Sequence, residues 1–289
     1  MSFSERIEQC LRANIDASRG PSCPPGLERA VEQAVFPGGA RVRPKICLAV
    51  AEACGEDRPE VTDAAAAAIE LLHCASLVHD DLACFDDSPL RRGKPSVHQA
   101  FGEPLAVLAG DALIVLAFEV LARMSDQAPD RVPKILQIVT RSVGMQQGII
   151  AGQAWECESD INLSDYQQLK TGSLFAAATA AGAAAAGVAS DPWIALGQQI
   201  GSAYQVVDDI LDVAGSAESM GKPIGQDVLR DHPSSVREMG LAGAREHFEQ
   251  VMKGIVEKIP DCPGRAMLRR RVLEESGKFL PHRLADHAA

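Results

Sequence analysis

Aromatic residues are scarce in this chain of 289 residues: Phe, Trp and Tyr together make up 4% of it. Sheet proteins usually draw on aromatic and β-branched residues, whereas this sequence is rich in alanine, with 46% of its residues hydrophobic. Small side chains allow helices to pack closely. We therefore predict an all-α protein, long enough to bury a large core.

Positive charge is also in deficit. The chain has 28 Lys and Arg residues against 39 Asp and Glu residues, which gives a formal net charge of −11. Proteins that bind nucleic acid normally carry a clustered excess of basic residues, so we expect no nucleic-acid partner. An acidic protein that binds a small anionic substrate would need metal ions to do so.

Paired cysteine motifs, a signal-like N-terminus and long apolar runs are all missing. No two cysteines form a CxxC pair, and no stretch of about 20 residues is apolar without Gly, Pro or charge. We expect reduced thiols in a cytoplasmic protein without a membrane span; disulfides or a zinc site remain the alternatives. The eight cysteines are Cys10, Cys23, Cys47, Cys54, Cys74, Cys84, Cys157 and Cys262.

Helix breakers divide the chain into helical segments that we assign to one domain, residues 1–289. Asp191 followed by Pro192 is a clear start signal, and Ser164 with Gln167 forms a capping box for the preceding helix. Residues 84–96 and 215–233 have the composition of loops. Helices are predicted over 4–18, before Pro37, from about Pro44, over 62–78, over 97–123 with a break near Pro104, over 131–157, through Lys170 to Gly187, and over 191–213, 241–258 and 263–279.

Two aspartates stand four residues apart on the helix predicted over 191–213. Asp208 and Asp212 therefore project from one face, with Asp209 beside them. The alternative is a solvated acidic helix end, but apolar residues such as Val207 and Ile210 flank the cluster. Three carboxylates on a buried helix repel one another unless cations neutralise them.

A second acidic cluster ends the other strongly apolar helix. Asp80 and Asp81 close the helix predicted over 62–78 and its extension, and Asp86 and Asp87 follow. Taken alone, these could be solvated loop residues. Two such clusters on apolar helices indicate a cation site, and oxygen ligands without cysteine favour Mg²⁺, with Mn²⁺ possible, bridging to substrate phosphates.

Basic residues complete this picture. Gly38 and Gly39 lead into Arg41 and Arg43 at a helix start, an arrangement suited to gripping an anion, although each arginine could also be a surface charge. Further candidates are Arg91 and Arg92 after the first acidic cluster, and Lys170 with Thr171 on a helix. His73 lies two turns before Asp80, where a core histidine is the alternative.

These motifs resemble those of isoprenyl diphosphate synthases. The similarity covers Asp80–Asp86 with Arg91-Arg92-Gly93-Lys94-Pro95, Gln205–Asp212, Gly38-Gly39 with Arg41, Gly110-Asp111-Ala112-Leu113, Lys170-Thr171-Gly172 and Gly221-Lys222, in the family's order. Within the family the chain is most similar to the carotenoid-pathway geranylgeranyl diphosphate synthases of purple photosynthetic bacteria. The resemblance implies a helical bundle around a central active-site cavity, a homodimer and a role in carotenoid supply.

The resemblance also implies residue roles in condensing isopentenyl diphosphate with an allylic diphosphate. Asp80, Asp86 and Asp208 would coordinate Mg²⁺, supported directly or through water by Asp81, Asp209 and Asp212. The allylic substrate would contact Arg91, Lys170, Thr171, Gln205 and Lys222, and isopentenyl diphosphate would contact Arg43, His73 and Arg92. Of these, Asp80, Asp86, Lys170 and Asp208 are the expected catalytic residues.

Product length in the family depends on the depth of the tunnel below the first aspartate. The farnesyl enzymes often place an aromatic residue five positions before it, whereas this chain has Ala75 and Ser76 there. We therefore expect a geranylgeranyl product made from farnesyl diphosphate. A shorter farnesyl product, with Ala75 merely packing against a neighbouring helix, is the alternative.

The chain departs from the family's pattern at three positions. Ala40 and His232 replace usual lysines, and Glu156 lengthens the carboxylate of Gly152-Gln153-Ala154-Trp155-Glu156. The two lost lysines leave fewer basic residues at the substrate site. An alternative is therefore that the chain is a non-catalytic subunit of a heteromeric synthase. A terpene cyclase is a weaker rival, because it would carry Ser and Glu where this chain has Asp212 and Ser216.

Overall fold

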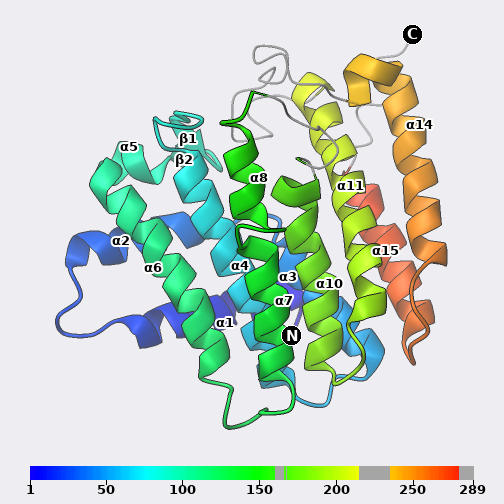
Figure 1. The fold of residues 1–289 in the computed structure, drawn as a ribbon, viewed down its shortest axis with the longest axis horizontal. Coiled ribbons are helices and arrows are strands. Elements are labelled where there is room, and N and C mark those ends of the chain that lie inside the picture. Colours follow the sequence, from blue (N-terminus) through cyan, green and yellow to red (C-terminus); the bar gives the residue numbers. More distant parts are fainter. Residues whose placement is uncertain (160–165, 167, 215–234, 280–289) are drawn as a thin grey trace.

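A computed structural model describes residues 1–159, 166, 168–214 and 235–279 (Figure 1). Within these ranges the protein is a bundle of helices with one short hairpin, which confirms the all-α prediction. The helices are α1 (Phe3–Ser18), α2 (Pro25–Val35), α3 (Val42–Cys54), α4 (Pro59–Asp80), α5 (Val97–Phe101), α6 (Glu103–Ala122), α7 (Val132–Val143), α8 (Ile149–Trp155), the π-helix η1 (Gln168–Gly172), α10 (Ser173–Ala185), α11 (Asp191–Ala214), α14 (Ser235–Glu257) and α15 (Arg265–Phe279).

Local signals set the helix boundaries. At α1, Ser2 Oγ accepts a hydrogen bond from Glu5 N, and the Glu5 carboxylate accepts one from Ser2 N, so two otherwise unsatisfied donors are capped. Prolines occupy the first turn of α2, α4, α6 and α7, where no amide donor is needed. α11 begins at Asp191, as predicted.

The alanine-rich helix α10 is the centre of the bundle, packed against α3, α4, α7 and α11. All thirteen of its residues are buried. Gly182 lets α3 approach closely, since a Cβ there would lie 2.4 Å from the Cys47 carbonyl oxygen. Alanine and glycine thus do here what the composition predicted, bringing helices close together.

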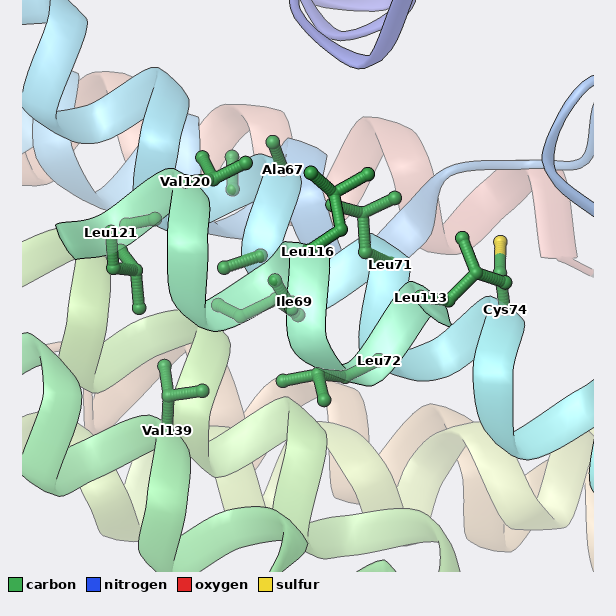
Figure 2. Close-up of a cluster of buried hydrophobic side chains, with 14 of the residues drawn as sticks. Ala67, Ile69, Leu71, Leu72, Cys74, Leu113, Leu116, Val120, Leu121 and Val139 are labelled. Atoms are coloured by element: carbon green, nitrogen blue, oxygen red, sulfur yellow. The ribbon is translucent and has the colours of Figure 1, made fainter. Parts of the chain in front are cut away.

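A second layer of the core joins α4 to α6. Figure 2 shows side chains of the two helices meeting along their length, and Val139 of α7 belongs to the same cluster of buried residues. The labelled members are Ala67, Ile69, Leu71, Leu72 and Cys74 of α4 and Leu113, Leu116, Val120 and Leu121 of α6. This packing fixes the end of α4 that carries Asp80.

The structure corrects two predicted segments. The loop predicted over 84–96 contains a hairpin of β1 (Leu90–Arg91) and β2 (Lys94–Pro95), whose turn residues Arg92 and Gly93 both have positive φ, as a type I′ turn requires. The single helix predicted over 131–157 is α7 and α8, separated at Gly144–Gly148. Close packing of Gly148 on the Val143 main chain, 2.3 Å from a would-be Cβ, explains that break.

Some predicted segments cannot be compared with the structure, because they lie outside the residues that it describes. Ser164, Gln167 and the loop over 215–233 are outside the described residues, and the assignment of residues 1–289 to one domain stays a prediction. Among described helices, α4 and α6 are long and apolar enough to cross a membrane by length and composition alone. Most of the apolar window of α4 (78%) is buried inside the protein, which is the pattern of a core helix.

Candidate active site

One cavity of about 1130 Å³ brings most of the predicted site residues together. Its volume is above the ~300–1,000 Å³ usual for a single small ligand, which leaves room for two substrates. The predicted residues that line it are Arg43, His73, Ala75, Ser76, Asp80, Arg91, Arg92, Lys170, Thr171, Gln205 and Asp208. They come from α3, α4, the hairpin, η1 and α11.

The structure divides each Asp-Asp pair into two roles. Asp80 and Asp208 line the cavity, whereas Asp81 and Asp209 are each only 2% exposed and do not line it. Arg91 donates to both oxygens of Asp81, which ties the hairpin to the end of α4. Asp209 accepts from Gln205 Nε2 at 3.0 Å and from Ser235 N at 2.8 Å, which joins α11 to α14. Both carboxylates are thus already hydrogen-bonded to protein groups, and their predicted support of a metal stays a prediction.

The loop after Asp80 turns back on itself and holds Asp86 beside the end of α4, although Asp86 is not among the residues that line the cavity. Asp86 N donates to Asp80 O at 2.9 Å, and Ser88 N donates to Asp81 O at 3.2 Å. Burial raises the pKa of Asp80, Lys170 lowers it, and the neighbouring carboxylate of Asp86 raises it further. Two carboxylates held this close, one of them desolvated, favour binding of a cation.

Lys170 is positioned by a π-helical turn. Its Nζ lies 3.4 Å from Asp80 Oδ1 and pairs with Glu156, which also accepts from the Tyr166 hydroxyl. Gly152 of α8 allows this arrangement, because a Cβ there would lie 2.4 Å from Lys170 N. Burial opposes the charge of Lys170, but Asp80 and Glu156 outweigh it and raise the pKa, so the ammonium is retained. π-turns are common at functional sites.

Glu156 and Tyr166 were not predicted as site residues. The signal for Glu156 was present, since it ends the Gly152–Glu156 motif in place of the usual aspartate. Its longer side chain reaches Lys170, so this departure preserves a carboxylate beside the lysine. Tyr166 had no comparable signal, because it lies outside every motif.

Thr171 and Gln205 connect η1 to α11. Thr171 Oγ1 donates to Gln205 Oε1 at 3.1 Å, and the Gln205 amide then donates to Asp209. Both Thr171 and Gln205 line the cavity beside Asp208. Their orientation is therefore set by a hydrogen-bonded chain that ends in the buried Asp209.

A second group of cations lines the cavity, formed by Arg43 and Arg92. In the described part of the chain no carboxylate lies within ion-pair distance of Arg43, which packs on the Phe175 ring at 4.5 Å and contacts His73 Nε2 at 3.4 Å. Burial lowers the pKa of Arg43, a sign of an uncompensated desolvation cost. Buried nitrogens of both arginines, Nε of Arg43 and Nη1 of Arg92, have no hydrogen-bond partner among the described residues. An anion would satisfy them.

Arg41, a candidate from sequence, also lines the cavity, but its guanidinium is already paired with protein groups. It is 4% exposed, and its guanidinium donates to Glu8, to Glu70 Oε1 at 2.7 Å and to Val35 O at 2.6 Å. No motif singled out Glu70, although it is one of only two acidic residues between Thr62 and Val78. Arg41 therefore acts as a structural partner in the cavity wall, paired with Glu70.

We predict that the stability of the protein depends on pH through His73, which lies near the same arginines. Burial, with Arg43 and Arg92 nearby, lowers the pKa of His73 well below 6.5. As the pH falls below 6.5, His73 becomes protonated in the unfolded chain but stays neutral in the folded protein, so the folded state loses stability relative to the unfolded state. Relative to His73→Gln, the free energy of unfolding should fall by up to about 1.4 kcal/mol per pH unit from pH 6.5 downward. Denaturant unfolding of the wild type and His73→Gln at pH 7.5 and 5.5 measures this loss. An equal change in the free energy of unfolding of both proteins between the two pH values would contradict the prediction.

Apolar residues line the remainder of the cavity. Ala75 is 1% exposed and small, and it leaves space bounded by Leu72, Ile114, Val143 and Leu174. Ser76 donates its hydroxyl to His73 O at 2.8 Å, which removes it as a free polar group. The cavity thus joins charged groups to an apolar compartment.

Gly110 explains another of the sequence motifs. A Cβ at Gly110 would lie 2.1 Å from Nε2 of His79, so a larger residue in α6 would require the ring of the residue that precedes Asp80 to move. The His79 ring lies 3.3 Å from Val107 O and 3.8 Å from the Asp111 carboxylate. The motif thus holds the end of α4 in place.

Three predicted residues cannot be located. Lys222 and His232 lie outside the described residues, and the side chain of Asp212 is likewise not described, although the helix that carries it runs to Ala214. Their roles stay predictions.

A family model described as polyprenyl synthetase matches residues 24–267. The chain belongs to the polyprenyl synthetase family. Geranylgeranyl diphosphate synthases of Cereibacter sphaeroides and Rhodobacter capsulatus are 51% and 52% identical to it, over 99% of this chain and 99% and 97% of theirs. The family predicted from the motifs is therefore confirmed.

Two solved structures share this fold. A geranyltransferase of Helicobacter pylori, complexed with magnesium and isoprenyl diphosphate, superimposes with a TM-score of 0.83 at 29% identity, covering 96% of each chain. A geranylgeranyl pyrophosphate synthase superimposes with a TM-score of 0.80 at 22% identity. The predicted fold class is confirmed.

The residues present fit the magnesium that the family implies. Among the described residues no three His, Cys, Asp or Glu side chains form a cluster able to enclose a metal. Instead, carboxylates from α4 and α11 face one cavity, and Mg²⁺ suits such a site because it keeps few protein ligands and is completed by water and substrate phosphates.

Proposed function

We propose that this enzyme condenses isopentenyl diphosphate with farnesyl diphosphate to give geranylgeranyl diphosphate. The observation that carries this proposal is one cavity lined by two aspartates, by two partly buried arginines that each have a buried, unsatisfied nitrogen, and by a set of apolar side chains. Two diphosphates and a long hydrocarbon tail match these three environments. The names of the two bacterial relatives support the product length.

We assign the allylic diphosphate to Asp80, Asp86 and Asp208 together with Lys170, Thr171, Gln205 and Arg91. Bound Mg²⁺ would stabilise the charge that develops on the departing diphosphate. Lys170 adds a fixed ammonium beside Asp80, and Thr171 and Gln205 offer oriented polar groups. Mn²⁺ could replace Mg²⁺, since both accept oxygen ligands.

The isopentenyl diphosphate is assigned to Arg43, Arg92 and His73. Neutral His73 contacts Arg43, and both arginines have nitrogens to give to phosphate oxygens. Ionisation of the allylic substrate leaves a carbocation in a compartment lined by Leu72, Ile114 and Leu174, which exclude water. The isopentenyl double bond attacks the cation, and a proton then passes to the released diphosphate.

Metal removal should abolish the reaction. Treatment with EDTA leaves the acidic groups Asp80 and Asp208 to repel the allylic diphosphate, so we expect incorporation of labelled isopentenyl diphosphate to fall to background. Adding excess Mg²⁺ should restore it, and Ca²⁺ at the same concentration serves as the control for ionic strength. Full activity in EDTA would contradict the assignment of the two aspartates.

Ala75 should control product length. Ala75→Phe places a ring where the cavity now passes α4, so we expect the main product to shorten from twenty to fifteen carbons, measured by mass spectrometry of the dephosphorylated alcohols. Ala75→Ser is the matched control, because it adds one oxygen atom and should keep the twenty-carbon product. An unchanged product from Ala75→Phe would mean that the tail does not pass this residue.

We also infer a homodimer and a cytoplasmic location. On α6, Val107, Leu108 and Val115 are 41%, 52% and 65% exposed, and burying such a face against a second copy would remove apolar surface from water. The cysteine pattern, without paired motifs, supports a reducing compartment. Supply of a carotenoid pathway is the corresponding physiological proposal, supported by likeness to the purple-bacterial enzymes.

A further inference from the structure

A buried carboxylate lies among the arginines of the isopentenyl diphosphate subsite. Glu70 is in α4, is 1% exposed and contributes to the cavity lining. Its Oε1 accepts from Arg41 Nη1 at 2.7 Å and lies 3.8 Å from Arg92 Nη2. Its Oε2 is buried without a hydrogen-bond partner. Burying a carboxylate of this kind costs free energy unless it pairs with the guanidinium groups around it.

Glu70 is linked to three other elements through Arg41. Arg41 has a left-handed backbone conformation (φ 49°) at the start of α3, and its guanidinium also bonds Glu8 of α1 and Val35 O at the end of α2. The position of Arg41 fixes the beginning of α3, two residues before Arg43. Glu70 therefore acts on Arg43 through the main chain.

Glu70 also faces Arg92 of the hairpin turn. Arg92 has a positive φ of 53°, and its guanidinium packs on Gly39, where a Cβ would lie 2.8 Å from Cζ. Nη2 is directed at Glu70, while Nη1 is buried and unsatisfied. Nη2 of Arg92 is thus held by Glu70, whereas Nη1 can donate a hydrogen bond to a ligand.

The charges of this group do not balance. Arg41, Arg43 and Arg92 carry three positive charges, whereas Glu70 is the buried carboxylate and Glu8, 43% exposed at its side chain, is the other acidic partner. The excess of positive charge favours binding of a diphosphate. Without Glu70, however, Arg41 and Arg92 would repel each other in a desolvated space.

We propose that Glu70 is a positioning residue for isopentenyl diphosphate, holding Arg41 and Arg92 so that Arg43 and Arg92 point at one anion. This inference rests on the proposed function of the cavity. It makes a counterintuitive prediction: removing a negative charge from an anion site weakens binding of the anion, because geometry outweighs net charge.

Steady-state kinetics of Glu70→Gln test this inference. The amide keeps the size and one acceptor of the carboxylate but removes its charge. We expect the KM for isopentenyl diphosphate to rise about tenfold with little change in kcat, and the KM for the allylic diphosphate to stay within about twofold. An unchanged or lower KM for isopentenyl diphosphate, or an equal rise in both KM values, would overturn the proposal.

Asp63→Asn is the matched control. Asp63 lies on the same helix, pairs with Arg6 and is absent from the cavity lining, so the same chemical change breaks an ion pair far from the substrates. We expect it to lower Tm while both KM values stay unchanged. If Asp63→Asn raised the KM for isopentenyl diphosphate as much as Glu70→Gln does, the effect would be structural and the proposal wrong.

A second variant covers the case in which Glu70→Gln does not fold. Glu8→Gln removes the more exposed end of the same chain of ion pairs, and we expect a smaller rise, about two- to threefold, in the KM for isopentenyl diphosphate alone. No rise in that KM would overturn the proposal.

Binding of inorganic diphosphate separates this inference from the proposed function. Calorimetry in EDTA leaves the aspartate part of the cavity without metal, and Lys170 and Arg91 there are already paired with carboxylates, so Arg43 and Arg92 are the main remaining diphosphate site. Glu70→Gln should bind inorganic diphosphate about tenfold more weakly than the wild type, whether or not any primer is turned over. If the wild type turns over no primer but Glu70→Gln still weakens diphosphate binding, the proposed function fails and the role of Glu70 stands. Equal binding by both proteins overturns the role of Glu70.

Discussion

Asp80→Ala should lower kcat/KM by about 10³-fold or more while leaving the helical circular dichroism unchanged. Asp80 faces the cavity from the end of α4, and burial raises its pKa, so the folded protein already holds this carboxylate at an energetic cost. Its removal therefore takes away an oxygen that we assign to the metal, without removing a net stabilising charge. Asp208→Ala, on the facing helix α11, should behave in the same way.

Asp81→Ala is the contrasting variant to Asp80→Ala. Asp81 is buried and ion-paired with Arg91, so we expect its loss to lower Tm more than the loss of Asp80 does, since it leaves Arg91 without its partner. Thermal unfolding and steady-state kinetics of both variants separate the two roles. If Asp80→Ala kept near-normal turnover, Asp80 would not be a metal ligand.

Gly152→Ala should also have a large effect, although Gly152 contacts no substrate. An added Cβ would lie 2.4 Å from Lys170 N and 2.6 Å from Lys170 Cα, and main-chain atoms cannot move aside by changing rotamer. Helix α8 and η1 must separate, which displaces both Glu156 and Lys170. We expect a loss of about 1–3 kcal/mol in the free energy of unfolding and a fall of at least about 10²-fold in kcat/KM.

Gly254→Ala provides the control for Gly152→Ala. Gly254 lies in α14 with no atom within 4 Å of its would-be Cβ, so the same substitution meets open space. Alanine should then stabilise the helix by about 0.5–1 kcal/mol, with activity unchanged. Denaturant unfolding and turnover assays measure both effects. Equal behaviour of the two variants would mean that Gly152 is not needed for the close approach to Lys170.

Helix positions were predictable because breakers and caps are local signals. Asp191-Pro192 marked the start of α11, and the apolar run from Thr62 marked α4. The hairpin at Arg91 and Lys94 was missed, since its turn depends on a positive φ at Arg92, which sequence does not favour for arginine. Packing between distant segments, rather than local propensity, imposes that conformation.

The candidate site was predicted in part for the same reason. Helix geometry put Asp208 on a defined face, and motif order supplied Asp80, Lys170 and Thr171, all of which line the cavity. The sequence did not distinguish Asp80 from Asp81, because the difference depends on which one Arg91 contacts after folding. Pairings over long sequence separations, such as Arg41 with Glu70, arise only from the tertiary structure.

The most direct test is to incubate the purified protein and Mg²⁺ with isopentenyl diphosphate and, in separate reactions, with dimethylallyl, geranyl or farnesyl diphosphate. Product chain length is then read by mass spectrometry. We predict geranylgeranyl diphosphate as the end product from farnesyl diphosphate. A fifteen-carbon end product would contradict the assigned chain length, and no product from any primer would contradict the proposed function itself.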